Sequence, residues 1–411
     1  MKDTKLYEEI LGLEGPWHVK SIELKAKEKV IEIEVECEEV LWACPKCGGR
    51  MHRHGSERRR WRHLDTCEFK TIVVCDVPRV FCKEDGAQVV QVPWAEKGSR
   101  FTRKFERFAI DVLLECSVKA ASQLLRISWD EADGIKERAV RRGLRSKEPR
   151  PVKRLCVDEK SAGPRHDYVT LVVRVDDDGS SAVEYIGDGR TEESLNGYWE
   201  SLSDEHLEGI EAVAMDMWKA YMNSTLLHLP GARDKIVHDR FHVMQDMNEA
   251  VNTVRKQEHR KLLREGDDTL RGSRQLWLFG RENVPEKSIE RFDQLRDTTL
   301  KTARAWAIKE MLRDFWFCND MTDGKDFFQL WYRWAARCRL PAVVAVARTL
   351  RRHLHNLLTY FKHRLTTAAA EGMNGKIQAL IKKAYGYRSR ERFKNDIFFH
   401  CGGLDLYPAE A

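Results

Sequence analysis

The spacing of hydrophobic residues changes several times along the chain and divides it into regions of different predicted structure. Residues 3–12 read as a short helix, and the alternation of apolar and acidic residues over 30–36 predicts a strand with one solvated face. From about residue 103 apolar residues recur every three or four positions, which predicts packed helices. Short apolar runs and helical segments alternate between 154 and 242, and residues 243–365 are helical in pattern almost throughout.

The region after residue 150 predicts a mixed α/β sheet in which strands end in aspartate. The apolar run before Asp158 reads as a buried strand that brings this carboxylate to the edge of a sheet, and Asp216 follows a second such run. Asp239 also ends a predicted strand. The expected strands are 154–158, 168–175, 181–186, 210–218 and 235–242, with helices at about 191–202 and 219–228.

A third acid is predicted on a helix near the C-terminus. An apolar stripe on this helix defines its packed side, and Glu371, Asn374 and Gln378 share a different face through their spacing of three and four. Glu371 is therefore expected at the edge of the packed surface, within reach of the sheet. The stripe consists of Met373, Ile377, Leu380, Ile381 and Ala384.

Two strand-terminal aspartates and one glutamate form a ligand set that suits two divalent ions. Oxygen-only ligation selects Mg²⁺ or Mn²⁺, and two ions about 4 Å apart activate a water or a 3′-hydroxyl and stabilise the leaving oxygen of a phosphoryl transfer. The acids would act as metal ligands rather than general bases. The alternative is that each is a solvated end of a strand or helix, which is the favoured interpretation for any single acid.

The N-terminal region contains a Cys-x-x-Cys motif at Cys44 and Cys47, which is typical of a zinc knuckle. Cys82 follows 35 residues later (82 − 47) in a similar turn, with Asp85 where a second Cys or His is expected. Cys44, Cys47, Cys82 and Asp85 could thus hold Zn²⁺, and the alternative is a packed hairpin that has lost its metal. Other candidates for the fourth ligand are His52, His54, Cys67 and Cys75.

Two groups of cations suggest contacts with nucleic acid. One group follows the first knuckle and includes Arg58, Arg59, Arg60 and Arg62 around Trp61; beside a zinc module such a group favours phosphate contact over a merely solvated face. The other lies in residues 118–145, which read as helix, tight turn and helix, with Ser128 as N-cap of the second helix. An ordinary helical hairpin is the alternative. The cations expected to point outward from or just beyond this second helix are Lys136, Arg138, Arg141, Arg142 and Arg145.

The composition limits how the protein can bind polyanions and which cellular compartment suits it. The net charge of +6 (71 basic and 65 acidic residues) is small for 411 residues, so binding to a polyanion must depend on local clusters. Eleven cysteines without an N-terminal signal argue against a disulfide framework and favour a reducing cytoplasm. No stretch approaches 18 consecutive apolar residues, so no membrane span is expected.

Five sequence blocks resemble the ISL-three family of bacterial insertion-sequence transposases, and the similarity extends over nearly the whole chain. The most specific blocks are Asp-Arg-Phe-His at 239–242 and Glu-Gly-Met-Asn at 371–374. The others are Val-Asp-Glu at 157–159, Met-Asp-Met-Trp-Lys-Ala-Tyr at 215–221 and Lys-Ala-Tyr-Gly-Tyr-Arg at 383–388.

The resemblance implies an α/β ribonuclease-H-like core with an all-α insertion, preceded by a small zinc-binding β module and a helix-turn-helix domain. It places a DDE triad on Asp158, Asp216 and Glu371, with Asp239 as competitor for the second place. Asp239, His242 and Asn374 then become residues that orient the ligands or position DNA. The implied domains are 1–100 (zinc module), 101–150 (helix-turn-helix and linker), 151–245 (first part of the core), 246–365 (insertion) and 366–411 (helix with the final acid).

The resemblance further implies how the protein works. It would bind the terminal inverted repeats of an insertion sequence, cut double-stranded DNA at the element's ends and join the 3′-hydroxyl to target DNA, as a homodimer or larger assembly. Tryptophans of a helical insertion are more often core residues than ligands, but the resemblance makes Trp277 and Trp306 candidates for stacking on an unpaired base at the transposon end. Two alternatives remain, namely a repressor that binds DNA without chemistry and a structure-selective nuclease that cuts without joining.

Overall fold

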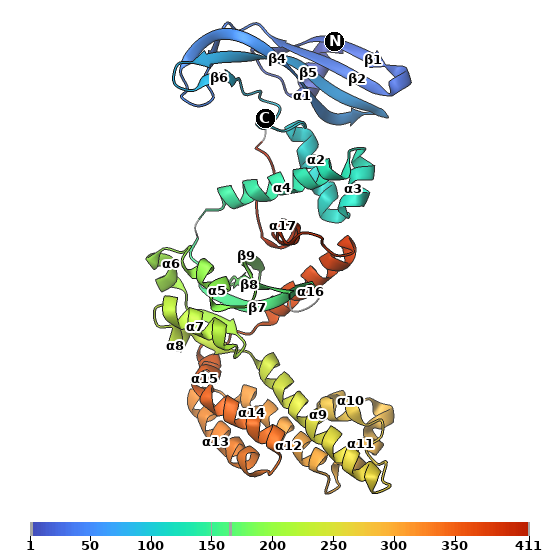
Figure 1. Ribbon diagram of the computed structural model, residues 1–411, viewed down its shortest axis with the longest axis vertical. Helices are drawn as coiled ribbons and strands as arrows, with labels where there is room; N and C mark the ends of the chain where they lie inside the picture. The colour runs from blue at the N-terminus through green and yellow to red at the C-terminus, as the bar shows by residue number, and fades with distance from the viewer. Residues whose placement is uncertain (1–2, 149, 164–166, 410–411) are drawn as a thin grey trace. The chain divides into compact units, whose positions relative to one another are not determined.

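The computed structural model describes residues 3–148, 150–163 and 167–409, and the chain forms two compact units (Figure 1). One unit consists of Met1–Glu148, Lys383–Gly386 and Asn395–Ala411, and the other of Pro149–Lys382 and Tyr387–Lys394. Residues 366–411, which were expected as one segment of the core, are therefore divided between the two units.

The N-terminal sheet is built around a long hairpin that the sequence pattern did not reveal. Arg50–Thr66 (β4) and Phe69–Cys82 (β5) pair antiparallel, with Trp61 opposite Val73. The predicted strand over 30–36 is confirmed as β2, which runs parallel to β5. The sheet order is β1-β2-β5-β4-β3, with β6 beside β5. The remaining elements are α1 (Asp3–Leu11), β1 (Trp17–Lys25), η1 (Ala26–Glu28), β2 (Val30–Cys37), β3 (Leu41–Ala43) and β6 (Gly86–Val89).

Three helices follow the sheet and pack around their own core. Ser128 caps α4, as expected from the sequence, and Glu131 completes a reciprocal capping box there; Ser117 caps α3. Ala121 and Ile135 are fully buried between these helices, and Phe399 from the C-terminal segment joins the same core. The helices are α2 (Arg103–Glu115), α3 (Val118–Leu125), α4 (Trp129–Ser146) and, near the C-terminus, α17 (Arg390–Cys401).

The second unit contains the predicted mixed sheet, with all five strands in the expected order along the chain. The sheet order is β11-β10-β7-β8-β9; β7, β8 and β9 pair antiparallel, and β10 lies parallel to both β7 and β11. The strands are β7 (Arg154–Gly163), β8 (Asp167–Val175), β9 (Ser181–Asp188), β10 (Ala212–Met215) and β11 (Ile236–His238). The connecting helices are α5 (Glu192–Trp199), α6 (Asp204–Gly209), α7 (Lys219–His228) and α8 (Ala232–Lys235).

Different elements cover the two faces of this sheet. Leu155 and Val157 of β7 pack in a core with Trp199 of α5 and Tyr221 of α7. Cys156 points to the opposite face, because successive strand residues alternate, and its thiol donates to the carbonyl of Thr366 at 3.4 Å. The segment that leads into α16 (Ala368–Ala384) therefore lies against the second face.

The expected helical insertion forms a domain with its own core, and its tryptophans lie mostly inside. Trp277, Trp306, Trp316 and Trp331 all belong to this core. The elements are α9 (Arg240–Arg264), α10 (Arg274–Leu278), η2 (Arg281–Asn283), η3 (Glu286–Ser288), α11 (Ile289–Arg296), α12 (Lys301–Asp314), η4 (Phe315–Phe317), α13 (Met321–Arg337), α14 (Pro341–Arg352) and α15 (Leu354–His363).

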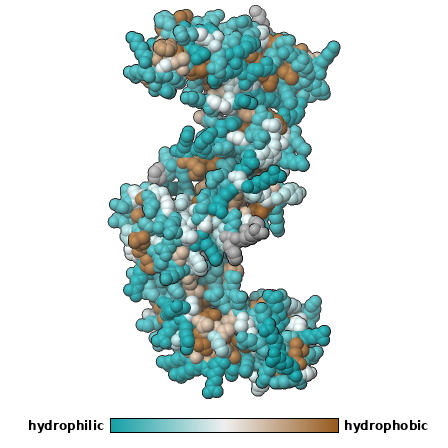
Figure 2. Space-filling model, in the orientation of Figure 1, coloured by the Kyte–Doolittle hydropathy of each residue, from teal (hydrophilic) through white to brown (hydrophobic). Residues whose placement is uncertain are grey.

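The visible surface is mostly hydrophilic, and its hydrophobic residues form small separate groups (Figure 2). Within the described ranges, no helix combines the length and the apolar character that crossing a bilayer requires.

Candidate active site and zinc module

Asp158 lies inside β7, which continues to Gly163, so the expectation that this aspartate ends its strand was wrong; Asp216 follows the end of β10 directly. Ala214 of β10 pairs with Cys156 of β7, and each acid lies two residues beyond this pair. Residues at equal steps along neighbouring parallel strands lie side by side, so the two carboxylates come together where β10 ends. Burial raises the pKa of both carboxyls, and the charges of Asp216 and Glu371 raise that of Asp158 further.

Asn374 attaches α16 directly to the first acid. Its side-chain Nδ2 donates to Oδ2 of Asp158 at 2.6 Å, while Oδ1 of Asp158 accepts the backbone amide of Glu159 at 2.8 Å. Glu371 lies three residues before Asn374 and therefore projects from a neighbouring position on the same side of the helix. The hydroxyl of Thr367 donates to the Glu371 carboxylate at 3.3 Å.

Asp239 caps a helix instead of standing free at a strand end. It follows β11, and its carboxylate accepts the backbone amides of Phe241 at 2.7 Å and Thr367 at 3.1 Å. Burial alone would raise the pKa of Asp239, but the nearby His242 imidazole and these amides hold it below the ordinary value. The backbone amide of Thr367 thus connects Asp239 to the segment that bears Glu371.

His242 is the cationic member of this group of acids. Its Nδ1 lies 3.6 Å from Oδ2 of Asp239. This contact, with added attraction from Asp216 and Asp158, raises the pKa of His242 to about 9. At neutral pH the imidazolium therefore partly offsets the buried negative charge.

The structure brings the expected acids to one site but leaves space between them. Among the described residues at this site, there is no group of three carboxylates or imidazoles whose ligand atoms all lie within 4.8 Å of one another.

One rim of the site consists of stacked side chains that the sequence reasoning did not single out. The Arg190 guanidinium lies 4.8 Å from the ring centroid of Tyr168 and 4.7 Å from that of Trp218. The Trp218 indole donates to the Arg190 carbonyl at 3.0 Å, and the Trp218 backbone amide donates to Asp216 at 2.8 Å. Arg190 also lies 3.8 Å from Glu159. A fixed cation therefore stands beside the acids; only Trp218, within the Met-Asp-Met-Trp block, gave a signal in the sequence.

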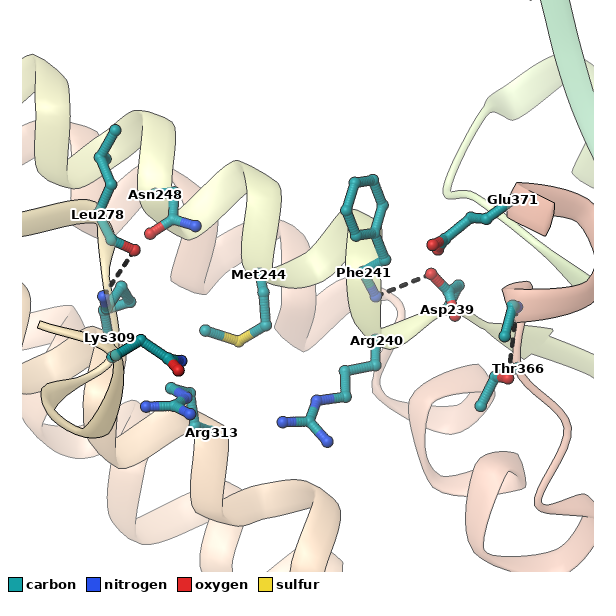
Figure 3. A pocket seen from close by; sticks show the side chains of 13 residues that line it. Asp239, Arg240, Phe241, Met244, Asn248, Leu278, Lys309, Arg313, Thr366 and Glu371 are labelled. Atoms are coloured by element: carbon teal, nitrogen blue, oxygen red, sulfur yellow. Dashed lines mark hydrogen bonds between the residues drawn. The ribbon is translucent and has the colours of Figure 1, made fainter. Parts of the chain in front are cut away.

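On the side of the helical domain, a pocket of about 380 Å³ opens next to Asp239 and Glu371. Figure 3 shows these two carboxylates at one end, Lys309 and Arg313 at the other, and Arg240 between them. The site therefore continues into a cavity with a cationic lining.

The four predicted zinc ligands converge in the N-terminal module. One ligand atom from each of Cys44, Cys47, Cys82 and Asp85 lies within 4.8 Å of all the others. Oδ2 of Asp85 faces the thiols of Cys44 at 3.8 Å and Cys82 at 3.5 Å, and its Oδ1 faces Lys46 at 3.5 Å. Backbone amides of Cys47 and Lys46 lower the pKa of the Cys44 thiol, which favours the thiolate that zinc requires.

The alternative fourth ligands do not join this cluster. His52, His54, Cys67 and Cys75 are absent from the cluster that the described residues form, and Cys75 is buried in the core of the sheet. Three thiolates and one carboxylate form a tetrahedral donor set that fits Zn²⁺.

Three cations expected to point outward from the helix-turn-helix are engaged inside the protein, so that expectation was wrong for them. Lys136 is 4% exposed, and its Nζ lies 2.7 Å from Asp396. Arg138 and Arg142 both bind the buried carboxylate of Glu106, with Nε of Arg138 at 3.0 Å and Nη2 of Arg142 at 3.1 Å. These cations hold the domain together instead of facing solvent.

Arg141 and Arg145 remain exposed on α4, as expected. Helix periodicity cannot distinguish these two from their neighbours, since the acids that bind the buried cations lie on other elements.

Three arginines of β4 that were expected to contact phosphate form ion pairs with acids at the surface of the sheet and keep exposed side chains. Arg58 pairs with Glu34 at 3.2 Å and Asp76 at 3.0 Å, and Arg60 pairs with Glu32. Arg59 pairs with Glu57 at 2.8 Å.

Arg62 was expected on a phosphate-contacting surface, and this expectation was wrong. Its side chain is 9% exposed, donates to the Asp65 carboxylate and lies over the Phe105 ring. Cross-strand acids, which a linear reading does not align with the arginines, account for much of the pairing along β4.

Trp277 and Trp306 are structural residues of the helical core, as tryptophans of such a segment mostly are, and their burial contradicts the hypothesis that they stack on a base. Trp277 is fully buried, and its indole donates to Ser273 at 3.1 Å. Trp306 is 6% exposed and donates to the carbonyl of Phe279 at 3.1 Å. Tryptophans spaced irregularly through a helical segment give no periodic signal that separates buried from exposed positions.

Comparison with known proteins agrees with this arrangement. Residues 155–397 match the model of the ISL3 transposase, described as "Transposase", and residues 90–140 match that of the "Helix-turn-helix domain of transposase family ISL3". Residues 41–85, which include all four converging ligands, match the "zinc-finger of transposase IS204/IS1001/IS1096/IS1165".

Two curated relatives are similar over almost their whole length. The transposase for insertion sequence element IS1001 of Bordetella parapertussis is 27% identical over 409 residues, covering 96% of this chain and 97% of the relative. The transposase for insertion sequence element IS1557 of Mycobacterium tuberculosis is 26% identical over 424 residues, covering 95% and 93%. Since the transposase model alone spans more than half of the chain, the protein belongs to the ISL3 (ISL-three) family of insertion-sequence transposases.

Proposed function

We propose that the protein cleaves DNA at the terminal inverted repeats of its insertion sequence and transfers the resulting 3′ ends to target DNA, with Asp158, Asp216 and Glu371 as a DDE triad. The observation that supports this most strongly is the position of the two aspartates, each two residues beyond a paired position on adjacent parallel strands. The Asn374 hydrogen bond to Asp158 brings the helix with Glu371 to the same edge.

The strand order supports a ribonuclease-H-like core. Numbered from β7 to β11 as one to five, the order is 3-2-1-4-5, with the first three strands antiparallel and the last two parallel to the first. In the order implied by the family resemblance, the second metal ligand follows the fourth strand. Asp216 follows β10 and meets this requirement, whereas Asp239 follows β11 and serves as a helix cap.

The residues at this edge fit divalent ions of the Mg²⁺ or Mn²⁺ class. The donors are carboxylate oxygens, and burial raises the pKa of Asp158 and Asp216, so a bound cation would relieve the cost of ionising them together. Two such ions, when bound by Asp158, Asp216 and Glu371, supply activation of the attacking oxygen and stabilisation of the leaving oxygen.

The chain's own residues set the geometry of both steps. In cleavage, a water oxygen bonds to phosphorus, the bond to the 3′ oxygen breaks, and a free 3′-hydroxyl remains. In transfer, that hydroxyl oxygen bonds to a target phosphorus and gives up its proton, while the bond to the target's own 3′ oxygen breaks and this oxygen takes up a proton to become a 3′-hydroxyl. Asn374 orients Asp158, and Asp239 fixes the segment before α16 by accepting the Thr367 amide. His242, beside Asp239, adds positive charge near the phosphates.

The N-terminal arm supplies recognition of the ends. The helix-turn-helix, with exposed Arg141 and Arg145, would contact the terminal repeat, and the zinc module would stabilise the arm that presents it. Because two ends must be held together for transfer, we expect a homodimer or larger assembly on DNA.

One assay separates this function from the repressor and nuclease alternatives. The full chain is incubated with a labelled duplex of the terminal repeat, a target plasmid and Mg²⁺ or Mn²⁺, and wild type is compared with Asp158→Asn. We expect cleavage and joining by wild type only. Binding without cleavage by wild type would favour the repressor, cleavage without joining would favour the nuclease, and cleavage by Asp158→Asn would contradict the triad.

A further inference from the structure

The part of the helical domain that follows Asp326 is basic and contains no acid. Between Asp326 and Glu371 the sequence has no Asp or Glu at all, although 65 acids occur in the chain. The same stretch has eight cations, more than the net charge of +6 of the entire molecule. They are Arg333, Arg337, Arg339, Arg348, Arg351, Arg352, Lys362 and Arg364.

Helix α13 presents its cations on the side that faces away from the core. Phe328, Trp331 and Ala335 are buried, which defines the inner stripe of the helix. Arg333 and Arg337 lie one turn apart and are both exposed. Trp334, also on this outer side, is 39% exposed and adds an aromatic surface between the two arginines.

Helix α14 repeats this arrangement. Val343, Ala347 and Leu350 form its buried stripe, and Arg348 and Arg352 are exposed on the opposite side. The side chain of Arg352 donates only locally, to the hydroxyl of Thr349 at 3.0 Å.

The two outer stripes are joined into one surface. The guanidinium of Arg351 on α14 lies 4.8 Å from the ring centroid of Tyr332, the neighbour of Arg333 on α13. Arg339 is exposed in the turn between the helices. We define the basic face as Arg333, Arg337, Arg339, Arg348, Arg351 and Arg352.

The cations of the basic face differ from others in the same domain. Lys261 lies 3.7 Å from Glu265, Arg271 lies 4.0 Å from Asp268, and Arg296 lies 3.1 Å from Asp293. Within the ranges that the structure describes, no ion pair to a carboxylate involves any of the six residues of the basic face. Six unneutralised guanidinium groups repel one another, so a polyanion that covers them gains their full attraction.

We propose that the basic face binds the phosphate backbone of double-stranded DNA without reading its sequence, as a second DNA-binding surface besides the helix-turn-helix. It lies in the unit that bears Asp158 and Glu371, whereas the helix-turn-helix belongs to the other unit. The catalytic unit thereby holds DNA through its own contacts. The proposal extends the proposed function but requires only DNA binding.

The test measures the affinity of the full chain for a random-sequence duplex across a series of salt concentrations in EDTA, so that catalysis plays no part. The test variant is Arg348→Gln/Arg351→Gln/Arg352→Gln. The matched control is Lys261→Gln/Arg271→Gln/Arg296→Gln, which removes three cations of the same domain that have acidic partners. We expect the test variant to bind on the order of tenfold to a hundredfold more weakly at 0.1 M salt, with a log–log salt slope shallower by about 2 to 3.

A second variant separates the effect of the charges from the effect of side-chain packing. Arg348→Lys/Arg351→Lys/Arg352→Lys keeps the three charges and should keep the wild-type salt slope, with thermal unfolding checked for every variant. Unchanged affinity and slope in the glutamine variant, or an equal loss in the matched control, would overturn the proposal. Either result would leave cleavage by the Asp158 site untouched, so failure here is distinct from failure of the proposed function.

Discussion

Asn374 donates a 2.6 Å hydrogen bond to the carboxylate of Asp158, across 216 residues of sequence. This bond connects α16 to β7 and places Glu371 on the same side of the helix. An amide is well suited here because it donates to a carboxylate without neutralising it, so the full charge remains for a cation.

Replacing Asn374 should therefore reduce activity without removing the acids. We expect Asn374→Ala to lower the cleavage rate roughly 10- to 100-fold and to raise the Mg²⁺ concentration needed for half-maximal rate, because orienting partners of metal ligands typically contribute that much. The measurement is a Mg²⁺ titration of cleavage. Ala379→Ser, at an exposed position of the same helix, should behave as wild type, and an unaltered titration for Asn374→Ala would remove this role.

The His242 imidazole should make metal-free stability depend on pH. Its pKa is raised to about 9, so its contribution is fully present below the ordinary pKa of 6.5 and is lost as the pH rises through 9. That contribution is at most roughly 3 kcal/mol for a pKa raised from 6.5 to about 9. Urea unfolding in EDTA should show wild type more stable than His242→Gln at pH 6, with the difference shrinking by pH 9.5. A difference that stays constant would show that His242 is not charged in the folded state.

The zinc module should contain one Zn²⁺ per chain. Cys82→Ser should lose the metal and destabilise the module, because a structural zinc site contributes directly to folding free energy. Asp85→Cys should retain zinc with higher affinity, since a fourth thiolate replaces a carboxylate. Metal analysis of the purified proteins checks both, with Cys67→Ser as control outside the cluster. Zinc retained at full stoichiometry in Cys82→Ser would refute the ligand assignment.

Cations on α4 should fall into two classes: those that bind DNA and those that stabilise the fold. Arg141→Ala/Arg145→Ala should weaken duplex binding and reduce the salt slope by about 2, with unchanged stability. Arg142→Ala should instead lower the unfolding free energy by roughly 3 kcal/mol, because it leaves the buried carboxylate of Glu106 with fewer partners. Salt-dependent binding and urea unfolding of both variants separate the classes; a stable Arg142→Ala protein with weakened binding would reverse the assignment.

Trp277 should contribute to the stability of the folded helical domain. Trp277→Ala should cost about 3–5 kcal/mol, as expected for a large aromatic side chain removed from a core. Trp334→Ala, at an exposed position of α13, should cost far less. Thermal unfolding of both variants tests this difference. Equal unfolding temperatures for the two variants would contradict the prediction.

The parts of the fold that depend on local pattern were predictable from the sequence. The buried run before Asp158 and the capping serine at 128 have local signatures, and the five strands of the α/β sheet appear in the predicted order. The register that sets Asp216 beside Asp158 follows once those strands are known to be parallel neighbours.

Several of the misplaced residues make contacts with residues that are distant in sequence. Lys136 looks like a surface cation on its own helix, but its partner Asp396 lies 260 residues away. In the sequence, Arg62 also looks like a surface cation, but its side chain packs over Phe105 of another element. Charged residues are mostly exposed on average, and only tertiary contacts reveal which of them are buried in pairs.

The most direct test of the triad compares Asp216→Asn with Asp239→Asn, since both aspartates follow neighbouring strands of the sheet. Cleavage of the terminal-repeat duplex in Mn²⁺ is measured for each variant under conditions in which both still bind the duplex. If Asp216 is a metal ligand and Asp239 a helix cap, Asp216→Asn should lose cleavage by on the order of a thousandfold or more, while Asp239→Asn keeps measurable activity. Cleavage by Asp216→Asn together with an inactive, folded Asp239→Asn would contradict the assignment.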